Sequence, residues 1–100
     1  MSPPAEITDS EQESAFIRNN VRGVIFYGSA ACPHCRSIAP LYEDLANKHN
    51  QIAFAHVETS LVDVEGLDGV PTFVAYKEGK AVDHVVGANS AQLISMVEAL

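Results

Sequence analysis

The sequence predicts a single-domain α/β fold, and three observations support this. Helical and strand-like patterns alternate along the 100 residues, as they do in sheets covered by helices. Residues 24–27 are continuously apolar, which indicates a strand buried on both faces. The length fits one domain, and the sequence contains no internal repeat. We therefore expect a short flexible tail at residues 1–5 and one domain at residues 6–100.

The first half of the chain contains two predicted helices, one on each side of that strand. Thr8 and Glu11 have the spacing of a capping box, which predicts a helix over about residues 9–19. A loop of small residues follows the strand, and a long helix should then run from about residue 32 to residue 49. Its apolar residues recur with the 3.6-residue period of one helix face: Ile38, Leu41, Tyr42 and Leu45.

The second half contains the patterns of a strand, one or two helical turns, a hairpin and a terminal helix. These elements are predicted at residues 52–57, 60–65, 72–76 with 81–86, and after Asn89 or Ser90. Gly66 is expected to end the helical turns. Residues 77–80 suit a tight turn, so the two hairpin strands should be antiparallel.

Charge and composition exclude several classes of function. Six basic and thirteen acidic residues give a net charge of −7, which disfavours contact with phosphate backbones and anionic lipids. No apolar run approaches the ~18 residues of a membrane span. The first residues lack the basic and apolar regions of a secretory signal, and their acidity argues against a transit peptide. We therefore expect a cytoplasmic protein that binds neither nucleic acid nor membrane.

The strongest functional signal is the pair Cys32 and Cys35. Two cysteines cannot complete a four-cysteine zinc site within one chain, which leaves an exchangeable dithiol or half of an intermolecular metal site. Cys32 stands at a helix start, where unpaired backbone N–H groups and the helix dipole favour the reactive thiolate. Cys35 lies one turn further in and should keep its proton. This predicts that Cys32 attacks a disulfide and Cys35 resolves the product.

The intervening residues Pro33 and His34 should set the redox balance of the pair. Proline suits the first turn of a helix. An imidazole beside the sulfurs would stabilise the thiolate, and therefore the reduced form, which makes the disulfide a stronger oxidant. About 1.4 kcal/mol of such stabilisation corresponds to ~30 mV for this two-electron couple.

Over residues 6–100 the chain resembles the thioredoxin family in four motifs. Residues 24–27 followed by Ala31-Cys-Pro-His-Cys resemble that family's strand and active-site turn, and Pro40 stands where the family has a proline that kinks the helix. Residues 69–73 and 86–88 resemble its cis-proline loop and last strand edge. The resemblance implies a three-layer α/β/α sandwich with a central mixed sheet, and a further short strand at about residues 6–8.

The same resemblance implies roles for single residues. Cys32 is the nucleophile and Cys35 the resolving thiol, and their redox-active disulfide works without a metal or other cofactor. A groove for extended substrate chains would be lined by Ala31, Val70, cis-Pro71, Gly87 and Ala88. The implied partners are protein thiols and disulfides, together with an upstream reductase or oxidant, and the chain would act as a monomer.

Four departures from the family pattern are informative. Ala31 replaces the usual Trp, which removes an aromatic wall, so substrate docking should be weaker or different. The Pro-His spacer resembles that of DsbA-type oxidases, and because of His34 we expect a potential above that of typical thioredoxin. Phe26 replaces a buried Asp, and His56 replaces the Lys that pairs with it. His56 is therefore either a proton acceptor for Cys35 or a strand-end histidine facing solvent or a backbone carbonyl.

Two other functions remain compatible with these residues. The chain could be a non-catalytic binding module that keeps the fold and uses its groove for a partner. It could also form a dimer that holds a metal or an Fe–S cluster between two CxxC pairs.

Overall fold

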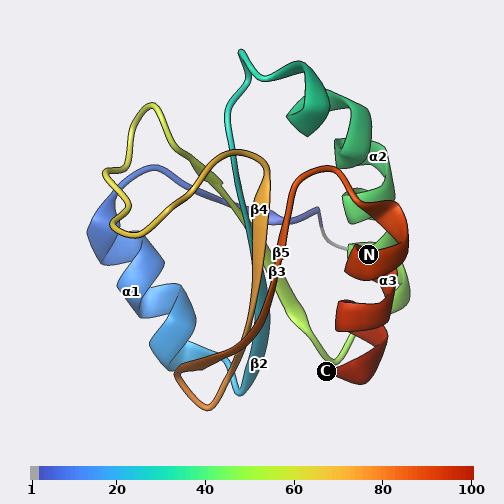
Figure 1. Cartoon of the computed structure of the whole chain (residues 1–100). Coiled ribbons are helices and arrows are strands. Elements are labelled where there is room, and N and C mark those ends of the chain that lie inside the picture. The colour runs from blue at the N-terminus through green and yellow to red at the C-terminus, as the bar shows by residue number, and fades with distance from the viewer. Residues whose placement is uncertain (1–2) are drawn as a thin grey trace.

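The computed structural model describes residues 3–100, which form five strands and three helices (Figure 1). In chain order these elements are β1 (Ala5–Ile7), α1 (Ser10–Asn19), β2 (Arg22–Gly28), α2 (Pro33–Lys48), β3 (Ala53–Glu58), β4 (Thr72–Lys77), β5 (Lys80–Val86) and α3 (Ser90–Ala99). The strands form one sheet in the order β1-β3-β2-β4-β5. The first three in that order are parallel, whereas β4 is antiparallel to both of its neighbours.

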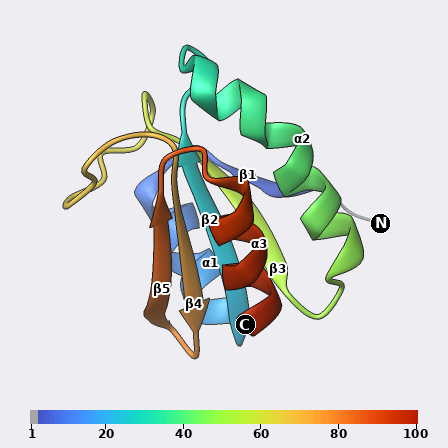
Figure 2. The same ribbon diagram turned by 45° about the vertical axis from the view of Figure 1, so that its right-hand side comes forward.

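Helices cover both faces of the sheet. Figures 1 and 2 show α1 on one face and α2 with α3 on the other. Side chains alternate along β2, so Val24 and Phe26 pack toward α2 and α3, while Ile25 and Tyr27 pack on the α1 side. The central strand is therefore apolar without interruption, as the sequence pattern predicted. The expected three-layer α/β/α sandwich with a mixed central sheet is confirmed.

The N-terminal segment differs from prediction in its details. Strand β1 occupies Ala5–Ile7 rather than residues 6–8, so residue 5 belongs to the sheet and not to the tail. Residues 1–2 of the predicted tail lie outside the described residues. The predicted cap is wrong by one residue, because Asp9 caps α1 and its side chain accepts the N–H of Gln12 at 2.8 Å. Aspartate is a stronger N-cap than threonine. The side chain of Gln12 in return accepts the N–H of Thr8.

The one or two helical turns predicted at residues 60–65 reduce to a single turn that begins at Glu58, and no helix forms there. The N–H groups of Leu61 and Val62 both reach the carbonyl of Glu58, at 3.0 and 3.2 Å, and the pattern stops after this one turn. The Glu58 carboxylate also accepts the N–H and hydroxyl of Ser60, which competes with helical hydrogen bonding. Val62 is buried in the core on the α1 side and anchors the loop.

One row of paired residues crosses the sheet on the α2 face and prepares the site. The pairs run strand by strand from β1 to β5: Glu6 with His56, His56 with Phe26, Phe26 with Phe73, and Phe73 with Val85. Partners in register point to the same face, so a carboxylate, an imidazole and two phenyl rings lie side by side.

Candidate active site

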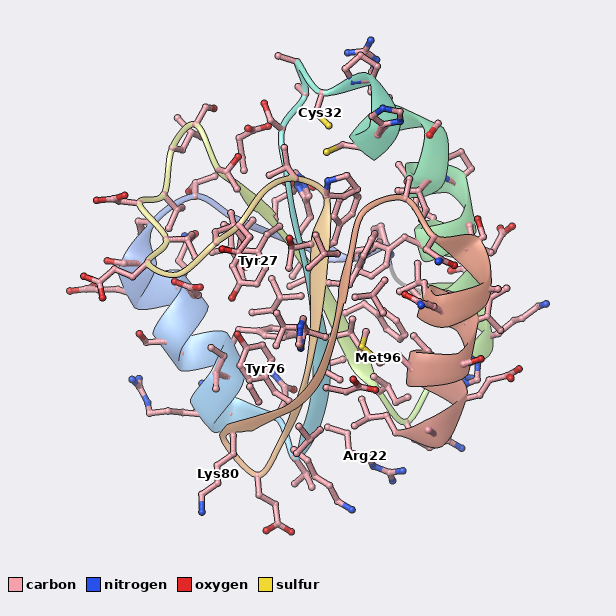
Figure 3. The ribbon with its side chains drawn as sticks, in the orientation of Figure 1. Arg22, Tyr27, Cys32, Tyr76, Lys80 and Met96 are labelled. Carbon is pink, nitrogen blue, oxygen red and sulfur yellow. The ribbon has the colours of Figure 1, made fainter. Side chains whose placement is uncertain are left out.

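The two cysteines lie at the junction of β2 and α2. Cys32 is the N-cap of α2, and its sulfur accepts the backbone N–H of Cys35 at 3.2 Å. Pro33 occupies the first turn, where its missing N–H leaves no hydrogen bond unmade. Figure 3 shows Cys32 at this helix end, far from Lys80 and Arg22 at the opposite end of the sheet. Both cysteines are free thiols here, and they lie close together, as a CxxC site requires.

The surroundings of Cys32 stabilise its thiolate. The hydrogen bond from the Cys35 thiol lowers the pKa of Cys32 most, and the backbone N–H groups of Cys35 and His34 lower it further. The guanidinium of Arg36 adds an attractive charge, and together these effects outweigh desolvation. The contribution of His34 to this pKa comes from its backbone N–H, and the effect of its ring on the redox balance stays a prediction. Cys32 is half-buried, so a substrate can reach its sulfur.

Cys35 has the opposite character. Its side chain is only 3% exposed, and burial followed by the bond to Cys32 raises the pKa of the Cys35 thiol to about 11. The end of β2 approaches it closely, because a Cβ on Gly28 would lie 3.1 Å from the Cys35 sulfur and 2.6 Å from the Phe26 ring. Glycine at position 28 is thus required by packing.

Two charged side chains that the sequence analysis gave no role in the site hold the active-site loop. Glu58 accepts the N–H of Ala30 at 3.0 Å, and Arg36 donates to the Ala30 carbonyl at 2.7 Å. Desolvation works against the charge of Glu58, but the hydrogen bonds from Ala30 and Ser60 prevail and lower its pKa. In the sequence, this role could have been indicated only by position: Arg36 directly follows Cys35, and Glu58 stands at the end of β3.

The structure places Val70 of the predicted groove next to Cys32, and Gly87 next to Pro71. The Val70–Pro71 peptide bond is cis, and the Cys32 sulfur lies 3.9 Å from the carbonyl of Val70. Gly87 donates its N–H to the carbonyl of Pro71 at 2.8 Å, which ties the two loops together. The other two predicted groove residues, Ala31 and Ala88, are exposed beside these groups.

The ring of His56 does not face a backbone carbonyl. Its Nδ1 atom lies 3.0 Å from the carboxylate of Glu6, and its edge meets the Phe26 ring with 5.0 Å between centroids. His56 also lines a pocket of about 390 Å³ that has Cys35 in its wall. The structure thus places His56 in the same pocket as Cys35, with the Glu6 carboxylate next to the Nδ1 atom of the ring.

Residues 3–100 contain no group of three or more His, Cys, Asp or Glu side chains arranged to hold a metal ion. Within the same residues no helix has the length and apolar character needed to cross a membrane.

Comparisons with known proteins agree with this geometry. The thioredoxin family model matches residues 4–99. Thioredoxin-3 of Dictyostelium discoideum is 33% identical over 103 residues, which cover 99% of this chain and 98% of that protein. A thioredoxin of Plasmodium falciparum has a TM-score of 0.90 at 27% identity, covering 95% of this chain and 97% of that one. A thioredoxin mutant of Entamoeba histolytica has a TM-score of 0.89 at 29% identity, covering 97% and 99%. The chain therefore belongs to the thioredoxin family of thiol–disulfide oxidoreductases.

Proposed function

We propose that this oxidoreductase exchanges disulfides with protein substrates at a reduction potential above that of typical thioredoxin. The observation that supports this is the contrast within the dithiol. The surroundings of Cys32 lower its pKa, whereas burial first, then the bond to Cys32, raises the pKa of Cys35 to about 11. One sulfur is thus ready to attack, and the other stays protonated until the first bond has formed.

The exchange proceeds in two displacements. The Cys32 thiolate attacks one sulfur of a substrate disulfide, forms a mixed disulfide and releases the first substrate thiolate. Cys35 then loses its proton and attacks the Cys32 sulfur, which closes the Cys32–Cys35 disulfide and releases the second thiolate. Two electrons pass from the cysteine pair to the substrate, and an upstream reductase must return them. Run in reverse, the same steps oxidise a substrate dithiol.

Thiolate stabilisation supports the higher potential. Every interaction that favours the Cys32 thiolate favours the reduced protein, and so makes its disulfide easier to reduce. The backbone N–H of His34 and the charge of Arg36 both act in this direction. We infer a potential between the about −270 mV of thioredoxin and the about −120 mV of DsbA.

The groove beside Cys32 supports binding of an extended substrate segment. Its walls would be Ala31, Val70, Pro71, Gly87 and Ala88, and the carbonyl of Val70 already lies beside the reactive sulfur. Backbone groups exposed along such a groove suit pairing with a peptide strand. We propose that the chain acts as a cytoplasmic monomer.

Equilibration with glutathione redox buffers tests the potential. The wild type should lie above about −270 mV. Replacing Pro33-His34 by Gly-Pro should lower the potential, whereas His34→Gln, which keeps the backbone N–H, should change it less. His84→Gln on β5 serves as the control for loss of a surface histidine. A wild-type reduction potential at or below that of thioredoxin would refute the proposed higher potential.

A further inference from the structure

We propose that His56 accepts the proton that Cys35 must lose, and that Glu6 holds the His56 ring in the orientation this transfer needs. The inference rests on the proposed exchange reaction, because a proton acceptor is needed only if Cys35 attacks the mixed disulfide. In this relay His56 is the proton acceptor, and Glu6 is a positioning residue.

The sheet places the two residues together. Glu6 on β1 and His56 on β3 are register partners, and Nδ1 of the ring lies 3.0 Å from Oε2 of the carboxylate. A carboxylate only accepts hydrogen bonds, so Nδ1 carries the hydrogen, and in the neutral ring Nε2 then keeps its lone pair. The Phe26 ring meets the imidazole edge-on from the next strand, which fixes the ring from a second side.

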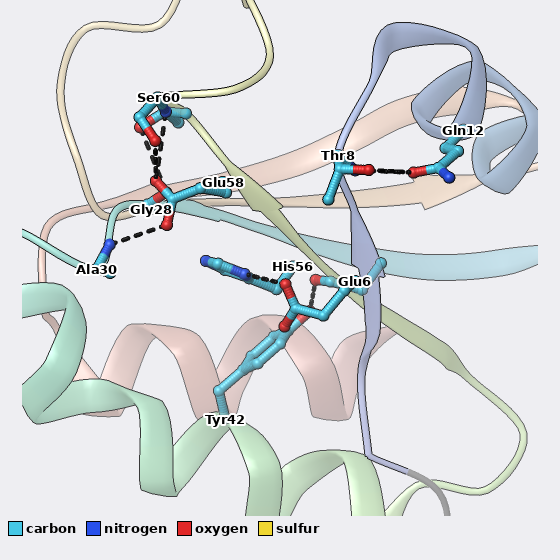
Figure 4. Close-up of polar contacts among 11 residues, drawn as sticks. Glu6, Thr8, Gln12, Gly28, Ala30, Tyr42, His56, Glu58 and Ser60 are labelled. Carbon is cyan, nitrogen blue, oxygen red and sulfur yellow. Dashed lines mark hydrogen bonds and ion pairs between the residues drawn. The ribbon is translucent and has the colours of Figure 1, made fainter.

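The free end of the ring faces the pocket that contains Cys35. Figure 4 shows the second ring nitrogen directed away from Glu6, toward the side where Ala30 and Glu58 lie. Cys35 and His56 line the same pocket of about 390 Å³. This volume exceeds the ~30 Å³ that a water molecule occupies in the liquid, and the walls offer polar partners, so water can carry the proton between sulfur and nitrogen.

The other charged groups of the pocket suit the task less well. Glu58 is occupied by hydrogen bonds from Ala30 and Ser60, which outweigh desolvation, lower its pKa and make it a weak base. Arg36 is a cation and only donates. Glu43, on α2, makes no hydrogen bond among the described residues to orient its side chain. Histidine is the side chain that gains and loses a proton around neutral pH.

The transfer balances within the second displacement. The proton leaves the Cys35 sulfur for Nε2 of His56, and the Cys35 thiolate attacks the Cys32 sulfur. The bond between Cys32 and the substrate breaks, and the substrate leaves as a thiolate. The imidazolium is stabilised by the Glu6 carboxylate and then releases its proton to the departing thiolate or to water.

A pH-jump experiment isolates this step. The reduced protein is labelled at Cys32 in acid with dipyridyl disulfide, a probe that reacts with thiols even at low pH, and release of the first thiopyridone confirms the mixed disulfide. The sample is then mixed rapidly with buffers of higher pH. Release of the second thiopyridone reports the attack by Cys35.

The relay predicts distinct pH profiles. Wild-type release should rise with pH and then reach a plateau, which is the signature of a side-chain general base rather than hydroxide. In His56→Gln, release at pH 7 should be on the order of 100-fold slower and should rise tenfold per pH unit without that plateau. In Glu6→Gln the rate should fall only roughly threefold, because this carboxylate is 68% exposed and its charge is screened. Glu43→Gln in the same pocket and His84→Gln outside it should match the wild type.

The outcomes separate the relay from the proposed function. Failure of Cys32 to form the mixed disulfide would refute the exchange reaction itself. Normal labelling followed by wild-type release in His56→Gln would overturn the relay and leave the exchange reaction standing. Nitrogen NMR of the wild-type protein gives a test that no variant can confound by misfolding. The relay requires hydrogen on Nδ1 of neutral His56, and hydrogen on Nε2 would overturn it.

Discussion

Replacing one cysteine at a time should expose a large asymmetry in covalent trapping. With a pKa of about 11, Cys35 is ionised in roughly one molecule in ten thousand at pH 7. The surroundings of Cys32 lower its pKa from 9.0, a value at which ~1% of a thiol is ionised, so its thiolate fraction exceeds that of Cys35 by at least ~100-fold. The more basic Cys35 thiolate is intrinsically about tenfold more nucleophilic, which leaves a factor of at least ~10.

This factor should appear as a difference in rate between two variants. Cys35→Ser should form a stable mixed disulfide with oxidised glutathione on the order of tenfold faster, or more, than Cys32→Ser at pH 7. Intact mass spectrometry after acid quenching measures the adduct, and the double variant gives the background. The bond to Cys32 is lost in Cys32→Ser, but burial, the largest cause of the raised pKa, remains. Equal rates would show that Cys35 is as accessible and as ionised as Cys32, and would refute the assigned roles.

Two further predictions concern stability. Burial raises the pKa of Cys35 to about 11 in the folded state, so the protonated thiol contributes to the stability of the reduced protein. This contribution is complete below the pKa of the thiol in the unfolded chain and is lost as pH rises toward 11. Thermal unfolding of Cys35→Ala should therefore depend less on pH above about 8.5 than that of the wild type. Tyr42→Phe should lower the free energy of unfolding in urea by about 1–2 kcal/mol and leave the reduction potential unchanged, because the buried hydroxyl donates to backbone carbonyls of β2 and β3, at 3.0 and 2.6 Å.

The elements that the sequence predicted well are those whose local pattern of apolar residues reflects how they pack in the fold. The apolar run 24–27 matches the centre of β2, because that strand is covered on both faces. The period of Ile38, Tyr42 and Leu45 marks the buried face of α2. The cysteine pair could be placed at a helix start from its spacing and from the proline that follows the first cysteine, since both features act within one helical turn.

The residues around the dithiol were harder to predict, because they meet only through the sheet. Strand β1 has three residues and a single buried side chain, Ile7, so neither alternation nor length marks it. Glu6 lies 50 positions before His56, and only the parallel pairing of β1 with β3 brings them together. The loop at residues 60–65 has helix-forming residues, but side-chain hydrogen bonds to Glu58 end the helical pattern after one turn.

The packing of Phe26, in the same core cluster as Cys35, gives a physical reason why Glu6 and His56 lie on β1 and β3 rather than on β2. Phe26 stacks on Phe73 with ring centroids 4.7 Å apart and meets Tyr42 edge-on at 5.2 Å, so this position of the sheet is buried among aromatic rings. A carboxylate there would be buried without a partner at a cost of several kcal/mol. His56 lies one strand outward on β3 and Glu6 two strands outward on β1, where the carboxylate stays in contact with water and its charge costs little. The phenyl ring then forms a rigid wall against the imidazole of His56 on β3, so the same packing that disfavours a carboxylate at position 26 orients the proposed proton acceptor beside it.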